Sequence, residues 1–194
     1  MRTAIPFCFC LCLCLAAAAA CTTDPVAETA ERALGDEDPG IGPRPEHRAG
    51  QPCTVCHEPG GAASSAFAIA GTVVWGPQNR VGVAGARVEI LDARPGVTKP
   101  RVAVTNCAGN FFLRKDEVQL AYPLVVRVVP PVGTTVTMQT PIYRERSCAG
   151  CHAAQAGPRS PGPVVLVSAD DERRMAYAPP RECTDAFPWL RSAR

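Results

Sequence analysis

Two motifs of the form Cys-x-x-Cys-His stand far apart in this chain. They are Cys53-Thr54-Val55-Cys56-His57, here the first motif, and Cys148-Ala149-Gly150-Cys151-His152, the second motif. This spacing is typical of c-type haem attachment, in which two thiols add across the haem vinyl groups and the adjacent histidine binds the iron. The sequence therefore predicts two haem c groups. The thioether sites would be Cys53, Cys56, Cys148 and Cys151, and the axial iron ligands His57 and His152.

The same side chains are compatible with two other kinds of site. Four thiolates from two Cys-x-x-Cys pairs can close a tetrahedral zinc site if the motifs meet in space. Each pair can instead oxidise to a disulfide in an exported protein. The chain has only 3 His, so a histidine directly after both cysteine pairs favours haem over zinc or disulfides.

A sixth ligand for each iron is harder to identify. His47 is the one histidine outside the motifs, and Met138 is the best placed thioether. Both are candidate sixth ligands, and an axial methionine would raise the reduction potential relative to bis-histidine ligation. Other roles compete with this one, because Met138 could fill the core from a strand and His47 could lie in a solvated loop.

Residues 1–20 predict a secretory signal peptide, with a short positive start, an apolar run and a small-residue end. The stretch Ala18-Ala19-Ala20-Cys21 resembles a bacterial lipobox, which implies lipidation of Cys21; the alternative is ordinary signal-peptidase cleavage. Thr22 in place of Asp after this cysteine favours the outer membrane. We therefore expect a lipid-anchored protein on the periplasmic side of a bacterial membrane.

Counting cysteines predicts one disulfide. The chain has 11 Cys, of which four lie in the signal peptide, four in the motifs and one at the lipidation site. Cys107 and Cys183 remain. Because exported proteins form disulfides, a Cys107–Cys183 bridge is expected.

The elements that must position the motifs are predicted to be strands. The 20 Pro and 16 Gly favour turns and short strands over long helices. Residues 86–92 alternate polar and apolar side chains with period two, as a half-buried strand does. The predicted strands, which together indicate a β-sandwich, are 68–75, 86–92, 101–105, 111–113, 122–129 and 134–140.

Four spaced patterns in this region resemble the carboxypeptidase regulatory-like domain: Ile69-x-Gly71-x-Val73, Val83-x-Gly85-Ala86-x-Val88-x-Ile90, Thr105-x-x-x-Gly109-x-Phe111 and Tyr122-x-Leu124-x-Val126. The resemblance implies a transthyretin-like β-sandwich without catalytic residues. We expect the glycines at bends. We also expect residues 105–111 to form a hairpin whose Phe111 re-enters the core.

The predicted fold class is all-β, a single Ig/transthyretin-like β-sandwich with irregular flanking segments. In order, the segments are a signal peptide (1–20), a disordered tether (21–50), the first motif segment (51–65), the sandwich (66–145), the second motif segment (146–160), and a candidate last strand with an irregular tail (161–194).

The remaining composition excludes several functions. The net charge of +2 is nearly balanced, which gives no sign of nucleic-acid binding. No hydrolase or phosphate-binding motif is present, so we do not expect an enzyme. The sequence instead predicts an exported dihaem lipoprotein that transfers electrons with an unidentified redox partner protein and contacts a membrane through its N-terminal lipid. The alternative is a non-redox structural or binding lipoprotein whose cysteine pairs bind zinc or form disulfides.

Overall fold

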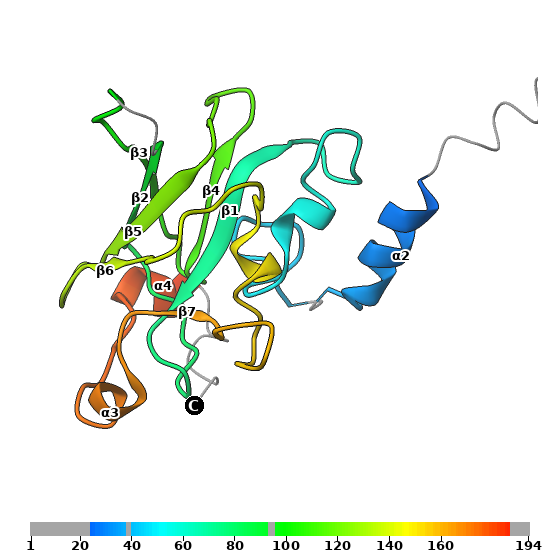
Figure 1. Ribbon diagram of the computed structural model, residues 1–194. Coiled ribbons are helices and arrows are strands. Elements are labelled where there is room, and N and C mark those ends of the chain that lie inside the picture. Colours follow the sequence, from blue (N-terminus) through cyan, green and yellow to red (C-terminus); the bar gives the residue numbers. More distant parts are fainter. Residues whose placement is uncertain (1–23, 38–39, 93–95, 187–194) are drawn as a thin grey trace, which may run out of the picture. The chain divides into compact units, whose positions relative to one another are not determined.

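The computed structural model describes residues 24–37, 40–92 and 96–186, and it gives no side-chain burial for 184–186. The chain divides into two compact units, residues 1–36 and residues 37–194. The first unit contains helix α2 (Pro25–Ala33), and the second contains every strand (Figure 1). The predicted signal peptide and the candidate lipidation site Cys21 lie outside the described residues.

The second unit is mostly β-structure, as predicted, and its strands form two sheets. The smaller sheet has the order β4-β1-β7. Its central strand β1 (Phe67–Val74) pairs with β4 (Asn110–Arg114) in antiparallel fashion and with the short β7 (Val164–Val165) in parallel.

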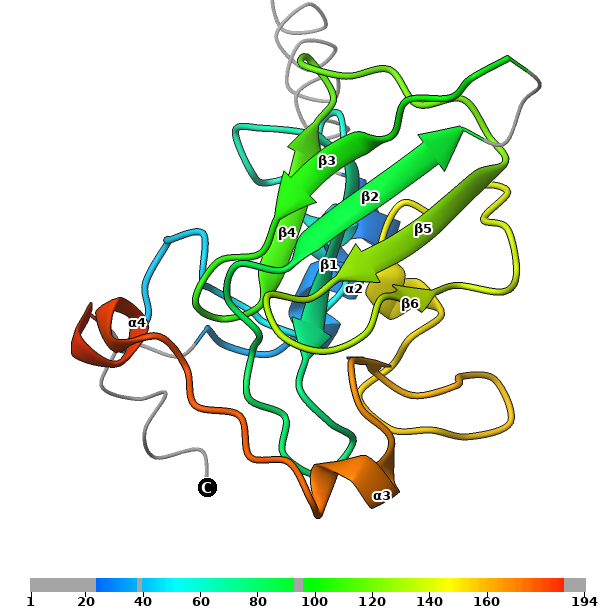
Figure 2. The same ribbon diagram turned by 90° about the vertical axis from the view of Figure 1, so that its left-hand side faces the viewer.

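The larger sheet is antiparallel throughout and has the order β3-β2-β5-β6 (Figure 2). Its strands are β3 (Arg101–Val104), β2 (Arg87–Asp92), β5 (Leu124–Val129) and β6 (Val136–Thr137). Strand β5 alternates as period-two patterning requires, with every second residue buried.

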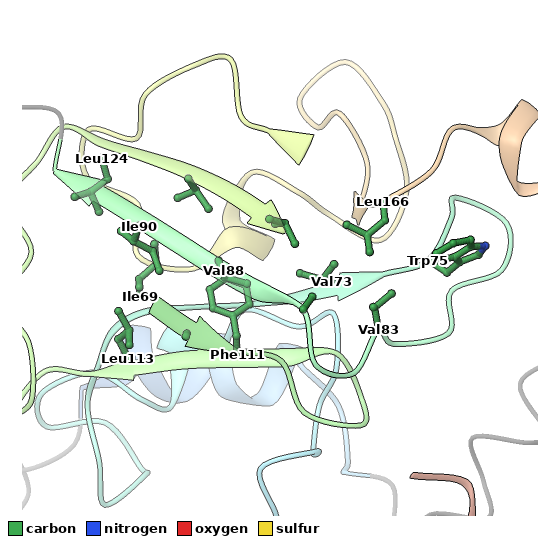
Figure 3. Packing of buried hydrophobic residues seen from close by; sticks show 14 residues of the cluster. Ile69, Val73, Trp75, Val83, Val88, Ile90, Phe111, Leu113, Leu124 and Leu166 are labelled. Atoms are coloured by element: carbon green, nitrogen blue, oxygen red, sulfur yellow. The ribbon is translucent and has the colours of Figure 1, made fainter. Parts of the chain in front are cut away.

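The two sheets share one hydrophobic core (Figure 3). Ile69 and Val73 of β1 are fully buried, and so is Val88 of β2. Burying an aliphatic side chain of this size stabilises a fold by about 1.5–3 kcal/mol. This core fixes the position of β1, the strand on which both motifs depend.

A disulfide joins the C-terminal part of the chain to the β3–β4 connection. Cys107 and Cys183 are bonded, with their Cα atoms 5.3 Å apart, which is the pairing expected from the count. Cys183 belongs to helix α4 (Arg181–Ala186), which follows the short helix α3 (Ala169–Glu172). The Cys183 side chain is 1% exposed.

Part of the predicted disordered tether over 21–50 is helical in the structure. Helix α2 forms within it, and the carboxylate of Asp24 caps this helix by accepting a hydrogen bond from the Val26 N–H at 2.9 Å.

The end of the predicted tether is also attached to the smaller sheet. The Asn110 side-chain amide donates to the carbonyl oxygens of Pro45, at 3.1 Å, and of His47, at 2.9 Å. The Gly50 N–H donates to the Thr72 hydroxyl at 2.8 Å. These partners come from β1 and β4, so the attachment depends on tertiary structure that no local pattern indicates.

Two expectations from the family resemblance require correction. Residues 105–111 do not form a hairpin, because β3 and β4 belong to different sheets and the segment connects them. Phe111 nevertheless enters the core. Gly71 lies within β1 and not at a bend, whereas Gly85 and Gly109 occupy left-handed turns with φ of +76° and +79°.

Candidate functional site

The two motifs fold in the same way although their surroundings differ in sequence. Each begins with a 3₁₀ turn, η1 (Cys53–Val55) in the first motif and η2 (Cys148–Gly150) in the second. In each, the histidine N–H donates to the carbonyl oxygen of the first cysteine, at 3.0 Å for His57 and 2.7 Å for His152. One tight turn therefore carries both sulfurs and the adjacent imidazole.

Strand β1 holds both motifs. Its Phe67 N–H donates to the His57 carbonyl and its Ala70 N–H to the Arg146 carbonyl, each at 2.9 Å. Arg146 also forms an ion pair of 3.7 Å with Glu58, which directly connects the two motif segments. Figure 1 shows the first motif in cyan and the second in yellow beside β1. Motifs distant in sequence are thus neighbours in space.

Each motif histidine is oriented by a backbone carbonyl. The His57 Nδ1 lies 2.8 Å from the Ser65 oxygen, and the His152 Nδ1 lies 3.0 Å from the Gly162 oxygen. Because a carbonyl only accepts, Nδ1 carries the hydrogen and the neutral ring keeps its lone pair on Nε2. Metal-binding histidines usually make this hydrogen bond.

Short loop hydrogen bonds keep these carbonyl oxygens in place. The Ser160 hydroxyl accepts from the Ala153 N–H at 2.8 Å and from the Gly162 N–H at 3.1 Å. In the first motif the Ala63 N–H donates to the Cys56 oxygen at 3.0 Å. Sequence reasoning missed the Ser65 and Gly162 acceptors, because backbone carbonyls leave no side-chain signal.

An apolar cavity of about 700 Å³ adjoins the second motif. This volume is within the range of cofactor and ligand sites. Its wall combines the second motif with β5, β6 and the loop after β6, and it includes Cys148, Cys151, His152, Met138, Val126 and Val164. Ser147 lies in the same wall, and its buried hydroxyl has no hydrogen-bond partner among the described residues. The sequence did not predict this cavity, since its lining comes from separate segments.

The first motif lies against aromatic rings. The His57 ring stacks on Phe67 with centroids 3.9 Å apart, and Phe67 stacks on Phe112 at 4.6 Å. Burial lowers the pKa of His57, and the hydrogen bond to the Ser65 carbonyl opposes this shift only in part. The ring is therefore held neutral, as a metal ligand must be.

The candidate sixth ligands fall beside different motifs. His47 lies next to His57, with ring centroids 5.8 Å apart and planes 12° from parallel. Met138 lines the cavity of the second motif. It follows β6 and is half-buried outside the core cluster, so it does not fill the core as the competing interpretation supposed.

All four motif cysteines are thiols. Burial raises the pKa of Cys53 to about 11 and that of Cys148 to about 12, and the Cys53 charge further raises the pKa of Cys148. Such groups stay protonated near neutral pH in the metal-free protein, and zinc binding would have to release these protons. The addition of a cysteine to a vinyl group, by contrast, retains both the sulfur and its hydrogen in the product.

A zinc ion and a haem need different ligand sets from the protein. In the described ranges, no three His, Cys, Asp or Glu side chains are grouped so that they could hold a metal ion. The four-thiolate zinc alternative needs such a group. A haem needs less from the protein, because the porphyrin supplies four nitrogens and one or two axial ligands complete the iron. The paired thiols and oriented histidines fit this second need.

Selective alkylation should distinguish the half-buried thiol of Cys148 from the exposed thiol of Cys151. In the haem-free protein at about pH 8, we expect Cys148 to react with iodoacetamide at least ten-fold more slowly than the exposed Cys151, because its thiolate is rare and shielded. Peptide mass spectrometry over time measures both rates. In denaturant the two rates should converge; equal rates in the folded protein would contradict the difference in exposure between the two thiols.

Gly71 makes room for the second motif. A Cβ at this position would lie 2.7 Å from the Cys148 Cβ, 2.8 Å from its Sγ and 3.0 Å from a Phe111 ring carbon. We expect Gly71→Ala to cost about 1–3 kcal/mol of unfolding free energy and to displace Cys148. Gly157→Ala is the matched control, since nothing lies within 4 Å of its added Cβ. Denaturant unfolding of both variants checks this, and equal stabilities would contradict it.

No protein-family model matches this chain, and neither does any curated protein or solved structure. In the part of the chain that the structure describes, no helix is long and apolar enough to cross a membrane. A function can therefore be proposed only from the residues and their geometry.

Proposed function

We propose that this chain is an exported dihaem c-type protein that transfers electrons. One observation carries the proposal: in both motifs, a pair of thiols adjoins a histidine whose Nδ1 is bonded to a carbonyl and whose Nε2 is left for a metal. The arrangement occurs twice, with unrelated loop sequences. The same cofactor type at both motifs explains why both histidines are oriented in the same way.

The second motif gives additional support through its cavity. Cys148, Cys151 and His152 all line the same apolar space of about 700 Å³. Apolar walls suit a porphyrin ring, which is large and mostly hydrophobic. Arg144 also lines this space and is exposed, so it is placed to pair with a propionate.

If bound, haem would supply one-electron exchange between a donor protein and an acceptor protein. The residues of this chain would hold and orient the haem groups. Cys53, Cys56 and the second pair would hold the groups covalently, and the carbonyls of Ser65 and Gly162 would fix the imidazoles in the ligating tautomer. No residue is assigned a role in breaking a substrate bond.

The remaining features of the proposal concern scaffold and location. The two-sheet core would be a transthyretin-like β-sandwich, consistent with the resemblance to the carboxypeptidase regulatory-like domain. The signal peptide and a lipid on Cys21 would place the protein on the periplasmic side of a bacterial membrane, with the outer membrane favoured. Its partner would be another redox protein.

A pyridine haemochrome spectrum tests the proposal. The full chain would be expressed in a bacterium that has c-type haem maturation machinery, and the purified protein analysed for haem and for zinc. We expect the spectrum of haem with both vinyl groups saturated. A colourless protein with stoichiometric zinc would overturn the electron-transfer function in favour of the structural alternative.

A further inference from the structure

We propose that residues 44–51, here called the strap, close the first motif, and that the second motif therefore receives its haem first. The order of haem attachment rests on the proposed function, whereas the closure by the strap does not. The two motifs fold alike, so the difference lies in their surroundings: the strap lies over the first, and the cavity adjoins the second.

The strap covers the histidine of the first motif. The His47 ring lies on the His57 ring, with centroids 5.8 Å apart and planes 12° from parallel. Phe67 covers the other face of His57 and stacks in turn on Phe112, so the four rings form one column. A metal ion binds an imidazole through a nitrogen lone pair in the plane of the ring. His47, which lies over the face, is thus placed as a cover.

The strap also contacts the first thiol. The Cys53 thiol donates to the Gln51 carbonyl at 3.6 Å, and the Cys53 side chain is half-buried. The Gln51 N–H donates in turn to the Arg48 carbonyl at 3.1 Å. One short segment therefore reaches both the imidazole and an attachment sulfur. A thiol so placed reacts slowly, because a reagent must approach the sulfur from solvent.

Polar contacts with the smaller sheet and the β3–β4 connection hold the strap closed. In addition to the bonds that Asn110 and Thr72 make with it, the Asn106 side-chain amide donates to the Pro45 carbonyl at 2.7 Å. The Thr72 hydroxyl donates to the Asn110 side-chain oxygen at 2.7 Å, which joins these contacts into one network. No residue of the strap belongs to the hydrophobic core cluster, so the strap can open while the core stays packed.

The backbone of the strap is strained at one residue. Arg48 has a φ of +50°, in the left-handed region that residues with a Cβ rarely adopt. The closed conformation therefore depends on the surrounding hydrogen bonds, and a residue that cannot adopt this φ should open the strap.

The second motif adjoins space that the first lacks. Cys148, Cys151 and His152 line the cavity of about 700 Å³, whose described lining includes no residue of the strap or of the first motif. In haem attachment each thiol adds its sulfur to one vinyl carbon and its hydrogen to the other, so the step needs no oxidant or reductant. At the second motif this addition requires no movement of the strap.

Two substitutions of Arg48 test the closure in the haem-free, full-length protein. Proline fixes φ at about −65°, so Arg48→Pro should open the strap. Arg48→Gly is the matched control, because it removes the same side chain but tolerates a positive φ. We expect iodoacetamide to alkylate Cys53 about five-fold faster or more in Arg48→Pro than in the wild type, and at a nearly unchanged rate in Arg48→Gly.

Peptide mass spectrometry over time measures these rates. Cys148 should keep its slow rate in all three proteins, which an unfolded variant would not allow. If Cys53 reacted equally fast in Arg48→Pro and in the wild type, closure by the strap would be refuted.

Maturation with a limited haem supply tests the order of attachment. Among wild-type molecules that carry a single haem, peptide mapping should locate it mainly on Cys148 and Cys151. Arg48→Pro should distribute the single haem more evenly between the motifs, and Arg48→Gly should not. A single haem found equally on both motifs, or mainly on the first, would overturn the order. Haem on neither motif would instead contradict the proposed function, and the alkylation rates would still decide whether the strap closes the first motif.

Discussion

Replacing Cys148 and Cys151 together by alanine should remove one of the two covalent haems and leave the other. We expect this because each motif has its own pair of thiols and its own histidine, which is oriented by a backbone carbonyl. The thiols of the first motif are not altered by this change. Pyridine haemochrome absorbance per mole of protein measures the loss.

The reciprocal variant, Cys53→Ala with Cys56→Ala, should also retain one haem. Ala149→Ser is a suitable control, because it changes the second motif at a position that offers no attachment sulfur, and it should keep both haems. If either double variant retained the wild-type haem content, the corresponding motif would not be an attachment site.

Removing the disulfide should have the largest effect on stability. Cys107 and Cys183 are separated by 76 residues, and a bridge that closes a loop of this length stabilises a fold by about 4 kcal/mol in the chain-entropy model. We expect Cys107→Ala with Cys183→Ala to lower the free energy of unfolding by about this amount. Denaturant unfolding followed by tryptophan fluorescence measures it.

A reductant provides the control for this prediction. Dithiothreitol should destabilise the wild-type protein to a similar extent and leave the double variant unchanged. Unfolding of variant and wild type at the same denaturant concentration would show that the bridge does not constrain the unfolded chain.

Most of the strands could be predicted because the hydrophobic pattern of a strand lies within its own few residues. The period-two alternation of 86–92 and the apolar run ended by Pro130-Pro131 correspond to β2 and β5. The hairpin over 105–111 was wrong, because a turn looks the same in sequence whether it joins partners in one sheet or connects two sheets. Gly71 was misassigned to a bend for a similar reason: its role depends on Cys148, which lies far away in the chain.

In the candidate site, too, only the features with a local sequence signal could be predicted. The attachment cysteines and the motif histidines could be predicted, because their chemistry requires a fixed short spacing. The Ser65 and Gly162 acceptors could not, since any residue has a carbonyl. His47 and Met138 were candidates by residue type alone. Only the folded chain separates them, His47 beside the first motif and Met138 in the cavity of the second.

The most direct test of two covalent haems is the intact mass of the matured protein after denaturation and acid extraction, which removes any haem that is not covalently bound. The reference is a variant in which all four motif cysteines are alanine, expressed and processed in the same host. After correction for the four substitutions, we predict that the wild-type protein is heavier by the mass of two haems. Equal corrected masses would contradict covalent haem attachment by this chain.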